Sequence, residues 1–107
     1  MYGIKEIDVN ELSKQLENLP ENVKLIDVRT PAEVARGKIS GSENCPLHVI
    51  PLKVNDFDSD DTIIFYCQTG ARSAQACAFM ASKGVENVYN LRGGIVTWVQ
   101  MGLPISS

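Results

Sequence analysis

The sequence TIIFYCQTGARS, residues 62 to 73, decides the fold and runs into an alanine-rich stretch at residues 74 to 83. The run at 62–66 is short, β-branched and aromatic, and such a run predicts a buried strand. The stretch at 74–83 is rich in helix formers and stops at Gly84, which predicts a helix. We therefore expect a strand, a tight loop that begins at Cys67, and a helix in direct succession.

Cys67 stands at the carboxyl end of this predicted strand. In open α/β sheets, ligands bind outside the carboxyl ends of the strands. The N–H groups of the loop and the start of the following helix place positive partial charge there, which lowers the pKa of a thiol. Arg72 adds a full positive charge in the same loop. This combination indicates a nucleophile that handles an anion.

The rest of the chain alternates between predicted strands and helices. The predicted strands cover residues 4–7, 23–28, 62–66 and 88–91, with a short strand near Cys45. The predicted helices cover residues 9–19, 31–36, 74–83 and 95–101, with a helical turn within residues 48–54. This alternation implies a mostly parallel sheet that is covered on both faces. We expect one α/β domain over residues 1–107.

Two helix starts carry specific signals. Asp8 with Glu11, and Thr30 with Glu33, match the capping box. Pro31 suits the first position of the second of these helices, because its missing N–H would have no partner there.

The composition excludes several functional classes. Of the 107 residues 44% are apolar and 21% are charged, which is ordinary for one globular domain. The net charge is −3 and the basic residues are scattered, which argues against a nucleic-acid partner. No apolar stretch is long enough to span a bilayer, and residues 1–5 show no signal-peptide pattern. We therefore expect a cytoplasmic protein without a membrane partner.

The number and spacing of the cysteines also favour a cytoplasmic protein. The chain has three cysteines, Cys45, Cys67 and Cys77, and one histidine. This odd, small number argues against a secreted disulfide framework, and the spacing matches no zinc site. We expect no metal and no cofactor. Cys77 is expected in the core, on a helix face shared with Ala74, Ala78 and Ala81. Cys45 is assigned to the core rather than to a second reactive thiol.

Four residues separate Cys67 from Arg72, and a loop with this spacing resembles the active-site loop of rhodaneses, the sulfurtransferase family. The similar loop of cysteine-dependent phosphatases is one residue longer and fits a tetrahedral phosphate, whereas the shorter ring suits a sulfane sulfur. Other segments resemble rhodanese signatures: LIDVR and PAE within residues 25–33, GKISGSEN at 37–44, and LRGG, Trp98 and GLP within residues 91–104. The resemblance covers nearly the whole chain. It departs at Lys38, where histidine is usual, and at Cys45, where an apolar residue is common.

The resemblance implies a single rhodanese domain, a three-layer sandwich with helices flanking a mostly parallel five-stranded sheet. It implies that the Cys67 thiolate takes a sulfane sulfur from thiosulfate or a persulfide donor and passes it from a persulfide to cyanide or a thiol. The residues expected to form the anion-binding loop are Gln68, Thr69, Gly70, Ala71, Arg72 and Ser73. Their N–H groups would stabilise the anionic sulfur, Gly70 would take a positive φ, and Arg72 would hold the loop and attract the donor. Asp27 and Arg29 match a structural pair, which implies an ion pair that braces the loop.

Other functions stay open at this point. A persulfide carrier that docks onto another protein would use the same Cys67 but turn over free thiosulfate weakly. A phosphatase or arsenate reductase is disfavoured by the short loop and by the lack of a clear general-acid aspartate. A catalytically silent scaffold is disfavoured by the intact Cys67 and Arg72. The expected partners are a small-molecule sulfur donor and acceptor, with a protein donor as an alternative, and a monomer or a homodimer fits equally.

Overall fold

The computed structural model describes residues 3–107, in which five parallel strands form a sheet in the order β1-β5-β4-β2-β3. The strands are β1 (Lys5–Ile7), β2 (Val23–Asp27), β3 (Glu43–Asn44), β4 (Thr62–Tyr66) and β5 (Val88–Leu91). The helices are α1 (Val9–Leu16), α2 (Pro31–Ala35), α3 (Ala71–Ser82) and α4 (Gly94–Gln100), with the 3₁₀ helices η1 (Leu47–Leu52) and η2 (Val54–Asp56). The predicted parallel, five-stranded α/β fold is confirmed. Residues 1 and 2, which the single-domain prediction includes, lie outside the described residues.

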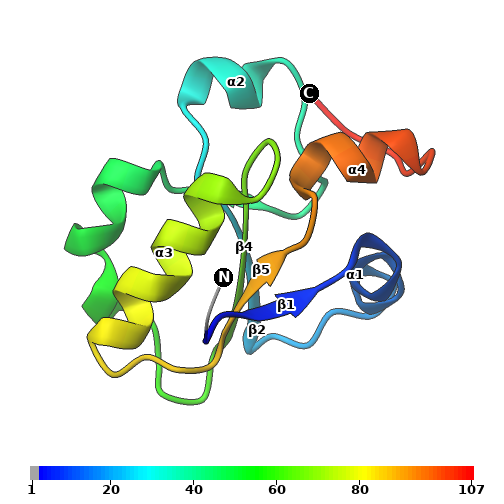
Figure 1. The fold of residues 1–107 in the computed structure, drawn as a ribbon. Helices are drawn as coiled ribbons and strands as arrows, with labels where there is room; N and C mark the ends of the chain where they lie inside the picture. Colours follow the sequence, from blue (N-terminus) through cyan, green and yellow to red (C-terminus); the bar gives the residue numbers. More distant parts are fainter. Residues whose placement is uncertain (1–2) are drawn as a thin grey trace.

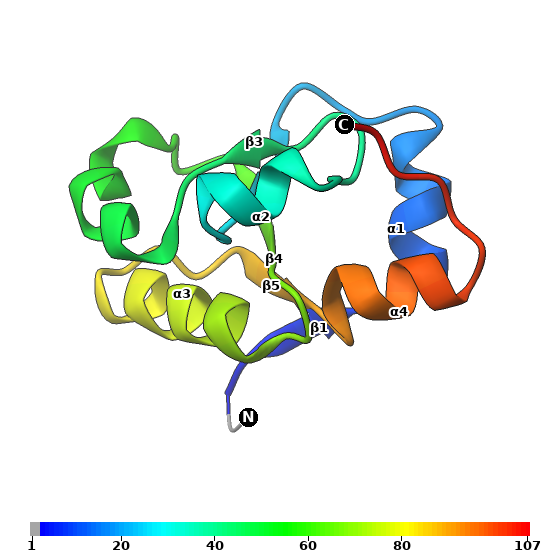
Figure 2. The same cartoon turned by 90° about the horizontal axis from the view of Figure 1, so that it is seen from above.

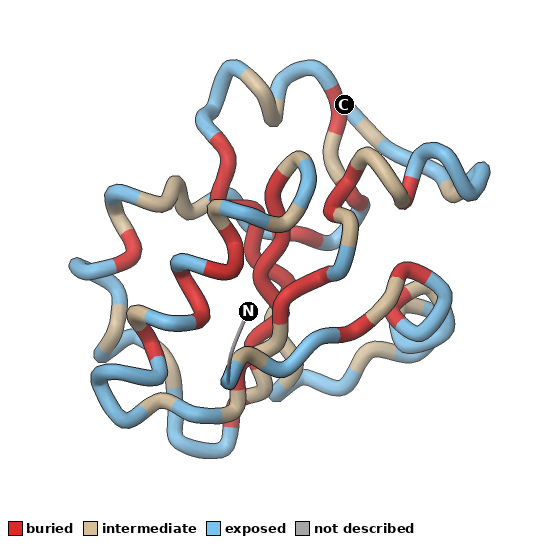
Figure 3. The backbone as a smooth tube through the Cα atoms, in the orientation of Figure 1, coloured by how far each residue is buried: buried red, intermediate tan, exposed pale blue. Residues whose placement is uncertain are grey.

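The sheet is the middle of three layers, with helices on both faces (Figures 1 and 2). Successive side chains of β4 point to opposite faces, so Ile64 enters one core while Ile63 and Phe65 enter the other. Helices α1 and α4 lie on the first side, and α3 lies on the second (Figure 2). The central strands are therefore buried on both faces (Figure 3). Along residues 3–107, none of the helices has the length and apolarity needed to cross a membrane.

Both predicted capping boxes are present. The carboxylate of Asp8 accepts a hydrogen bond from the N–H of Glu11, and the Glu11 side chain accepts one from the N–H of Asp8. Thr30 and Glu33 form the same reciprocal pair at the start of α2, where Pro31 occupies the first turn. These short-range signals fix where the two helices begin.

Helix α3 begins at Ala71, three residues earlier than the predicted start at residue 74. The cause is Gly70, whose φ of +112° lets the chain turn into the helix while it is still within the loop. The prediction for the buried face was correct for Ala74 and Cys77 but wrong for Ala78 and Ala81, which are exposed.

Other boundaries shift by a few residues. Helix α1 ends at Leu16 rather than at Leu19, although Leu19 continues the apolar helical spacing. The helical turn predicted within residues 48–54 is a pair of 3₁₀ helices. Helix α4 ends at Gln100, one residue before the predicted end at Met101, which is 55% exposed.

The carboxyl ends of β2, β4 and β5 meet at one edge of the sheet, because neighbouring strands run parallel. The chain leaves β4 there and forms a loop that lies between α2 and α4 (Figure 1). Residues that follow three separate strands therefore come together at this edge, where ligands bind in open parallel sheets.

Candidate active site

Cys67 follows directly on β4 and lies at the base of the loop, with only 1% of the residue exposed. The N–H of Gly70 donates to its Sγ at 3.1 Å, and the N–H of Ser73 lies at 3.5 Å. The hydroxyl of Ser73 lies 3.3 Å from the same sulfur. The loop thus curls around Cys67 with N–H groups directed at the sulfur, and the positive φ predicted for Gly70 is confirmed.

The start of α4 holds the loop in this shape from outside. The N–H of Ile95 donates to the carbonyl of Cys67 at 3.0 Å, and the N–H of Val96 donates to that of Gln68 at 3.1 Å. Gly94 permits this close approach, because its φ is +61° and a Cβ atom there would overlap both carbonyl oxygens. The loop therefore turns carbonyl groups toward α4 while N–H groups face the sulfur. The double glycine after β5 is the sequence signal that could have predicted this contact.

The surroundings of Cys67 favour its thiolate. Burial raises the pKa of the thiol, because a buried charge is poorly solvated. Hydrogen bonds to the thiolate act in the opposite direction and bring the pKa below its ordinary value; they come from the Ser73 hydroxyl, when it turns its proton toward the sulfur, and from the N–H groups of Ser73, Gly70 and Thr69. Cys67 therefore has a larger thiolate fraction near neutral pH than a free cysteine, and the thiolate is the nucleophilic form.

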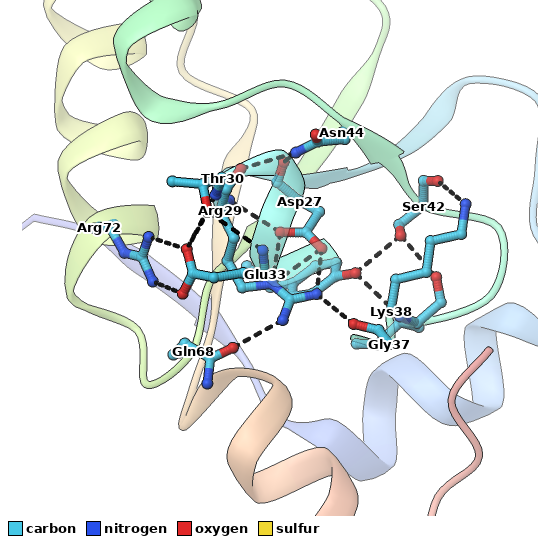
Figure 4. A network of polar contacts seen from close by, with 12 residues as sticks. Asp27, Arg29, Thr30, Glu33, Gly37, Lys38, Ser42, Asn44, Gln68 and Arg72 are labelled. Atoms are coloured by element: carbon cyan, nitrogen blue, oxygen red, sulfur yellow. Dashed lines mark hydrogen bonds and ion pairs between the residues drawn. The ribbon is translucent and has the colours of Figure 1, made fainter. Parts of the chain in front are cut away.

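Arg72, in the first turn of α3, pairs with Glu33 of α2 (Figure 4). Its Nη1 and Nη2 atoms each lie 2.8 Å from one carboxylate oxygen of Glu33. The hydrogen bonds from Arg72 lower the pKa of Glu33 to about 2, so this carboxylate is ionised at neutral pH. The charge of Arg72 is therefore shared with Glu33, a residue that sequence reasoning assigned only to the cap of α2.

Asp27 and Arg29 form a buried ion pair beside the loop (Figure 4). Their side chains are 0% and 4% exposed, and Nη2 of Arg29 lies 2.7 Å from Oδ2 of Asp27. Arg29 also donates to Oε1 of Gln68 at 2.8 Å and to the carbonyl of Gly37 at 2.7 Å. A buried pair of this kind requires such partners for its remaining donors. The pair singled out in the sequence thus contacts the residue next to Cys67.

Asn90 of β5 contacts the loop, and sequence reasoning did not find it. The residue is 5% exposed. Its Nδ2 donates to the carbonyl of Gly70 at 3.1 Å, and its Oδ1 accepts a short hydrogen bond from the Ser73 hydroxyl. The available signal was an amide in an otherwise apolar strand, because a buried polar side chain needs partners.

A groove of about 380 Å³ lies between α2 and α4 and borders the loop at Gln68. Arg36 contributes a charged wall, and Val96 and Val99 contribute an apolar one. A larger hollow of about 550 Å³ lies between α1 and Trp98 and includes no residue of the loop. We therefore associate the smaller groove, and not the larger hollow, with the candidate site.

The other two cysteines are less reactive by the same criteria. Burial raises the pKa of Cys77 to about 12 and also raises the pKa of the half-buried Cys45. All three cysteines are free thiols. Within residues 3–107, no three His, Cys, Asp or Glu side chains are grouped to hold a metal ion. Cys67 is therefore the thiol of this chain best suited to act as a nucleophile.

Comparison with known proteins identifies the family of the chain. The chain belongs to the family of rhodanese-like domains, whose model matches residues 8–101. A sulfurtransferase from Allochromatium vinosum is 45% identical to it over 95% of this chain and 94% of the relative. The thiosulfate sulfurtransferase GlpE from Stutzerimonas stutzeri is 35% identical over 69% and 68% of the two chains. The crystal structure of a rhodanese-like domain protein from Staphylococcus aureus is 32% identical, with a TM-score of 0.83 over 97% of this chain and all of that one.

Proposed function

We propose that this protein is a sulfurtransferase that moves a sulfane sulfur from thiosulfate or a persulfide donor to a thiophilic acceptor through a persulfide on Cys67. The observation that carries the proposal is the environment of Cys67. Its Sγ atom accepts hydrogen bonds from the N–H groups of Gly70 and Ser73, and the pKa of its thiol is lowered. The family match and the relatives named as sulfurtransferases support the same class of reaction. The relative named as a thiosulfate sulfurtransferase supports thiosulfate as a donor.

The first half-reaction forms the persulfide. The Cys67 thiolate attacks the outer sulfur of thiosulfate and forms a new S–S bond, while the S–S bond of thiosulfate breaks and sulfite leaves with its electron pair. The negative charge of the enzyme moves from Sγ to the new outer sulfur. Inward-directed N–H groups of the loop stabilise this anionic sulfur.

The second half-reaction restores the enzyme. An acceptor such as cyanide or a thiolate attacks the outer sulfur of the persulfide, the Cys67 S–S bond breaks, and the thiolate is released. Thiocyanate or a small persulfide leaves as the product. Neither step requires a proton from the enzyme. This fits the polar groups that the described residues 3–107 place at the sulfur, which are the Ser73 hydroxyl and the N–H groups of Gly70 and Ser73.

The loop length favours sulfur over phosphate. Four residues separate Cys67 from Arg72, one fewer than in cysteine-dependent phosphatases. The shorter ring closes tightly around the sulfur, since the N–H of Gly70 lies only 3.1 Å from Sγ. We assign Arg72 to holding the loop, through its pair with Glu33, and Arg29 to positioning Gln68.

An intact-mass measurement of the reduced protein after incubation with thiosulfate tests the proposal. We expect the mass to rise by one sulfur atom, and cyanide to remove that sulfur as thiocyanate. Cys67→Ser should gain nothing, whereas the matched variants Cys45→Ser and Cys77→Ala should behave like the unaltered protein. A sulfur gain that survives in Cys67→Ser, or no gain from either thiosulfate or a small persulfide, would contradict the proposal. Binding of vanadate to Cys67 would then favour phosphate chemistry.

A further inference from the structure

A continuous chain of polar groups leads away from the sulfur of Cys67 through Ser73 and Asn90 to the carbonyl of Gly70. The hydroxyl of Ser73 lies 3.3 Å from Sγ and donates to Oδ1 of Asn90. Nδ2 of Asn90 donates in turn to the carbonyl of Gly70 at 3.1 Å. Ser73 is 0% exposed and Asn90 is 5% exposed, so water does not compete freely for these groups.

The carbonyl of Gly70 fixes the direction of every hydrogen bond in this chain. A carbonyl only accepts, so Asn90 must turn its NH₂ group toward Gly70 and its oxygen toward Ser73. The oxygen of Asn90 also only accepts, so the Ser73 hydroxyl must donate to it. Ser73 then presents lone pairs, rather than a proton, to the sulfur of Cys67.

Taken alone, the hydrogen bond from Ser73 to Asn90 suits the thiol form of Cys67, and it opposes the N–H groups of Gly70 and Ser73, which favour the thiolate. A thiol donates its S–H to the Ser73 oxygen, and all the groups in the chain are then paired. A thiolate has no proton to donate and requires the Ser73 hydroxyl as a donor. The single hydroxyl proton of Ser73 cannot serve Cys67 and Asn90 at the same time.

We propose that Asn90 is a positioning residue that competes with the sulfur of Cys67 for the hydroxyl proton of Ser73. This inference rests on the proposed function, in which Cys67 is the nucleophile. When Cys67 loses its proton to solvent, the Ser73 hydroxyl rotates from Oδ1 of Asn90 to Sγ, and Oδ1 is left without its donor. No covalent bond other than S–H is broken in this step.

The same competition acts at the persulfide stage. Once the outer sulfur carries the negative charge, the inner Sγ is a neutral disulfide-type sulfur and no longer needs the Ser73 proton. The hydroxyl then returns to Asn90. Asn90 thus disfavours the thiolate relative to the persulfide, and favours transfer of charge from Sγ to the incoming sulfur.

The charged groups around the loop have partners of their own. Arg72 is paired with Glu33, and Arg29 with Asp27. Other titratable groups on and near the elements that surround the loop include the buried Tyr66 of β4, whose hydroxyl contacts Ile39 and Ser42, and Arg36 at the end of α2. They also include Tyr89 of β5, Lys24 of β2, Cys77 of α3, Cys45, the exposed His48 of η1, and the exposed Arg92, which pairs with Glu6. Because the hydrogen bonds of Asn90 run to Ser73 and Gly70, its substitution leaves these ion pairs in place.

The test is the pH dependence of alkylation of Cys67 by iodoacetamide, followed by peptide mass spectrometry and without any sulfur donor. Asn90→Leu is expected to lower the apparent pKa of Cys67 by about one unit, because Ser73 can then donate to the thiolate without loss of a partner. Ser73→Ala is expected to raise it by about one unit, because the thiolate loses a donor. In Ser73→Ala/Asn90→Leu the pKa should equal that of Ser73→Ala, since Asn90 acts through Ser73.

A purely structural role for Asn90 would give a different pattern. Loss of a structural tie would loosen the loop and raise the pKa in both single variants. An unchanged or raised pKa in Asn90→Leu, or an Asn90 effect that persists without the Ser73 hydroxyl, would overturn the proposal. Asn90→Ala, which adds no bulk, repeats the measurement if Asn90→Leu does not fold, with thermal unfolding as the check. Asn87→Ala is the matched control, because Asn87 bonds to Thr62 and should leave the pKa unchanged.

The two proposals fail separately. If the unaltered protein forms no persulfide but the alkylation pattern holds, the competition for the Ser73 proton stands and sulfur transfer falls. If persulfide forms and Asn90→Leu leaves the pKa where it was, the role of Asn90 falls and sulfur transfer stands.

Discussion

The carboxylate of Glu33 makes two different sets of hydrogen bonds. It accepts the N–H of Thr30 in the capping box of α2, and it pairs with both terminal nitrogens of Arg72 on α3. Loss of the charge on Glu33 therefore affects both the start of α2 and its contact with the first turn of α3.

We expect Glu33→Gln to destabilise the protein at neutral pH and to matter little near pH 2. The folded-state pKa of Glu33 is about 2, against an ordinary value of 4.5. A carboxyl with a lowered folded pKa adds stability above its unfolded pKa and loses it as the pH falls through the folded pKa. Urea unfolding of both proteins from neutral pH down to about 2 measures this difference, which should shrink on acidification.

The control for this experiment is Asp56→Asn. Asp56 is 61% exposed and pairs with Lys53, so its removal should change stability little at any pH. A stability difference for Glu33→Gln that stays constant across the whole range would show that its charge is not what stabilises the contact.

Arg29 is the second residue where charge and burial combine. Its replacement by Met is expected to lower the free energy of unfolding by about 3–5 kcal/mol, because the Asp27 carboxylate is then buried without its partner. Arg92→Met, which removes an exposed pair with Glu6, should cost less than about 1 kcal/mol. Chemical denaturation measures both, and equal losses in the two variants would contradict the argument. Asp27→Asn/Arg29→Met should recover part of the loss.

At the scale of elements, the position of α4 against the loop depends on one glycine. Gly94→Ala is expected to cost about 2–4 kcal/mol and to slow persulfide formation, because its Cβ would overlap the carbonyl oxygens of Cys67 and Gln68. Gly84→Ala is the matched control, since Gly84 also has a positive φ, of +86°, but open space around it. That variant should lose about 1 kcal/mol and no activity. Urea unfolding and the rate of mass gain measure the two effects, and equal behaviour would contradict this role of Gly94.

The elements could be predicted from the sequence where their signals are local. Asp8 with Glu11 marked the start of α1, and the run at 62–66 marked both ends of β4 correctly. The predicted end of α1 was wrong because Leu19 continues the apolar helical spacing beyond the last residue of the helix. The start of α3 was missed because Gly70 allows the loop itself to become helical, which depends on how the loop closes around Cys67.

The candidate site, too, could be predicted only where its residues are close together in the sequence. The spacing from Cys67 to Arg72 located the loop, because all of its residues are consecutive. The contact of Glu33 with Arg72, and those of Asn90 with Ser73 and Gly70, join segments that are distant in sequence. Such contacts depend on the register of the sheet, and a single sequence contains no direct record of it.

At the scale of the whole molecule, the C-terminal residues are hydrogen-bonded to the segment that contacts Arg29. Ser106 exchanges two backbone hydrogen bonds with Lys38, at 2.7 and 2.8 Å. The neighbouring residue, Gly37, provides the carbonyl that accepts from Arg29. The C-terminal segment therefore supports the loop that positions Arg29.

Deletion of residues 105–107 is expected to lower the free energy of unfolding by about 1–3 kcal/mol, since two backbone hydrogen bonds are lost. Deletion of Ser107 alone should have no measurable effect, because that residue is exposed. Urea unfolding of the two shortened chains measures the difference. An equal stability of both would show that the contact with Lys38 contributes nothing.

The parts of the Cys67 site come from the ends of β2, β4 and β5, and so the site exists only when these strands are assembled. In an unfolded chain Cys67 has none of its donors and is an ordinary thiol. The lowered pKa of Cys67 is thus a property of the assembled fold and not of the loop sequence alone. A misfolded chain therefore lacks the activated thiolate and, with it, the chemical reactivity of the site.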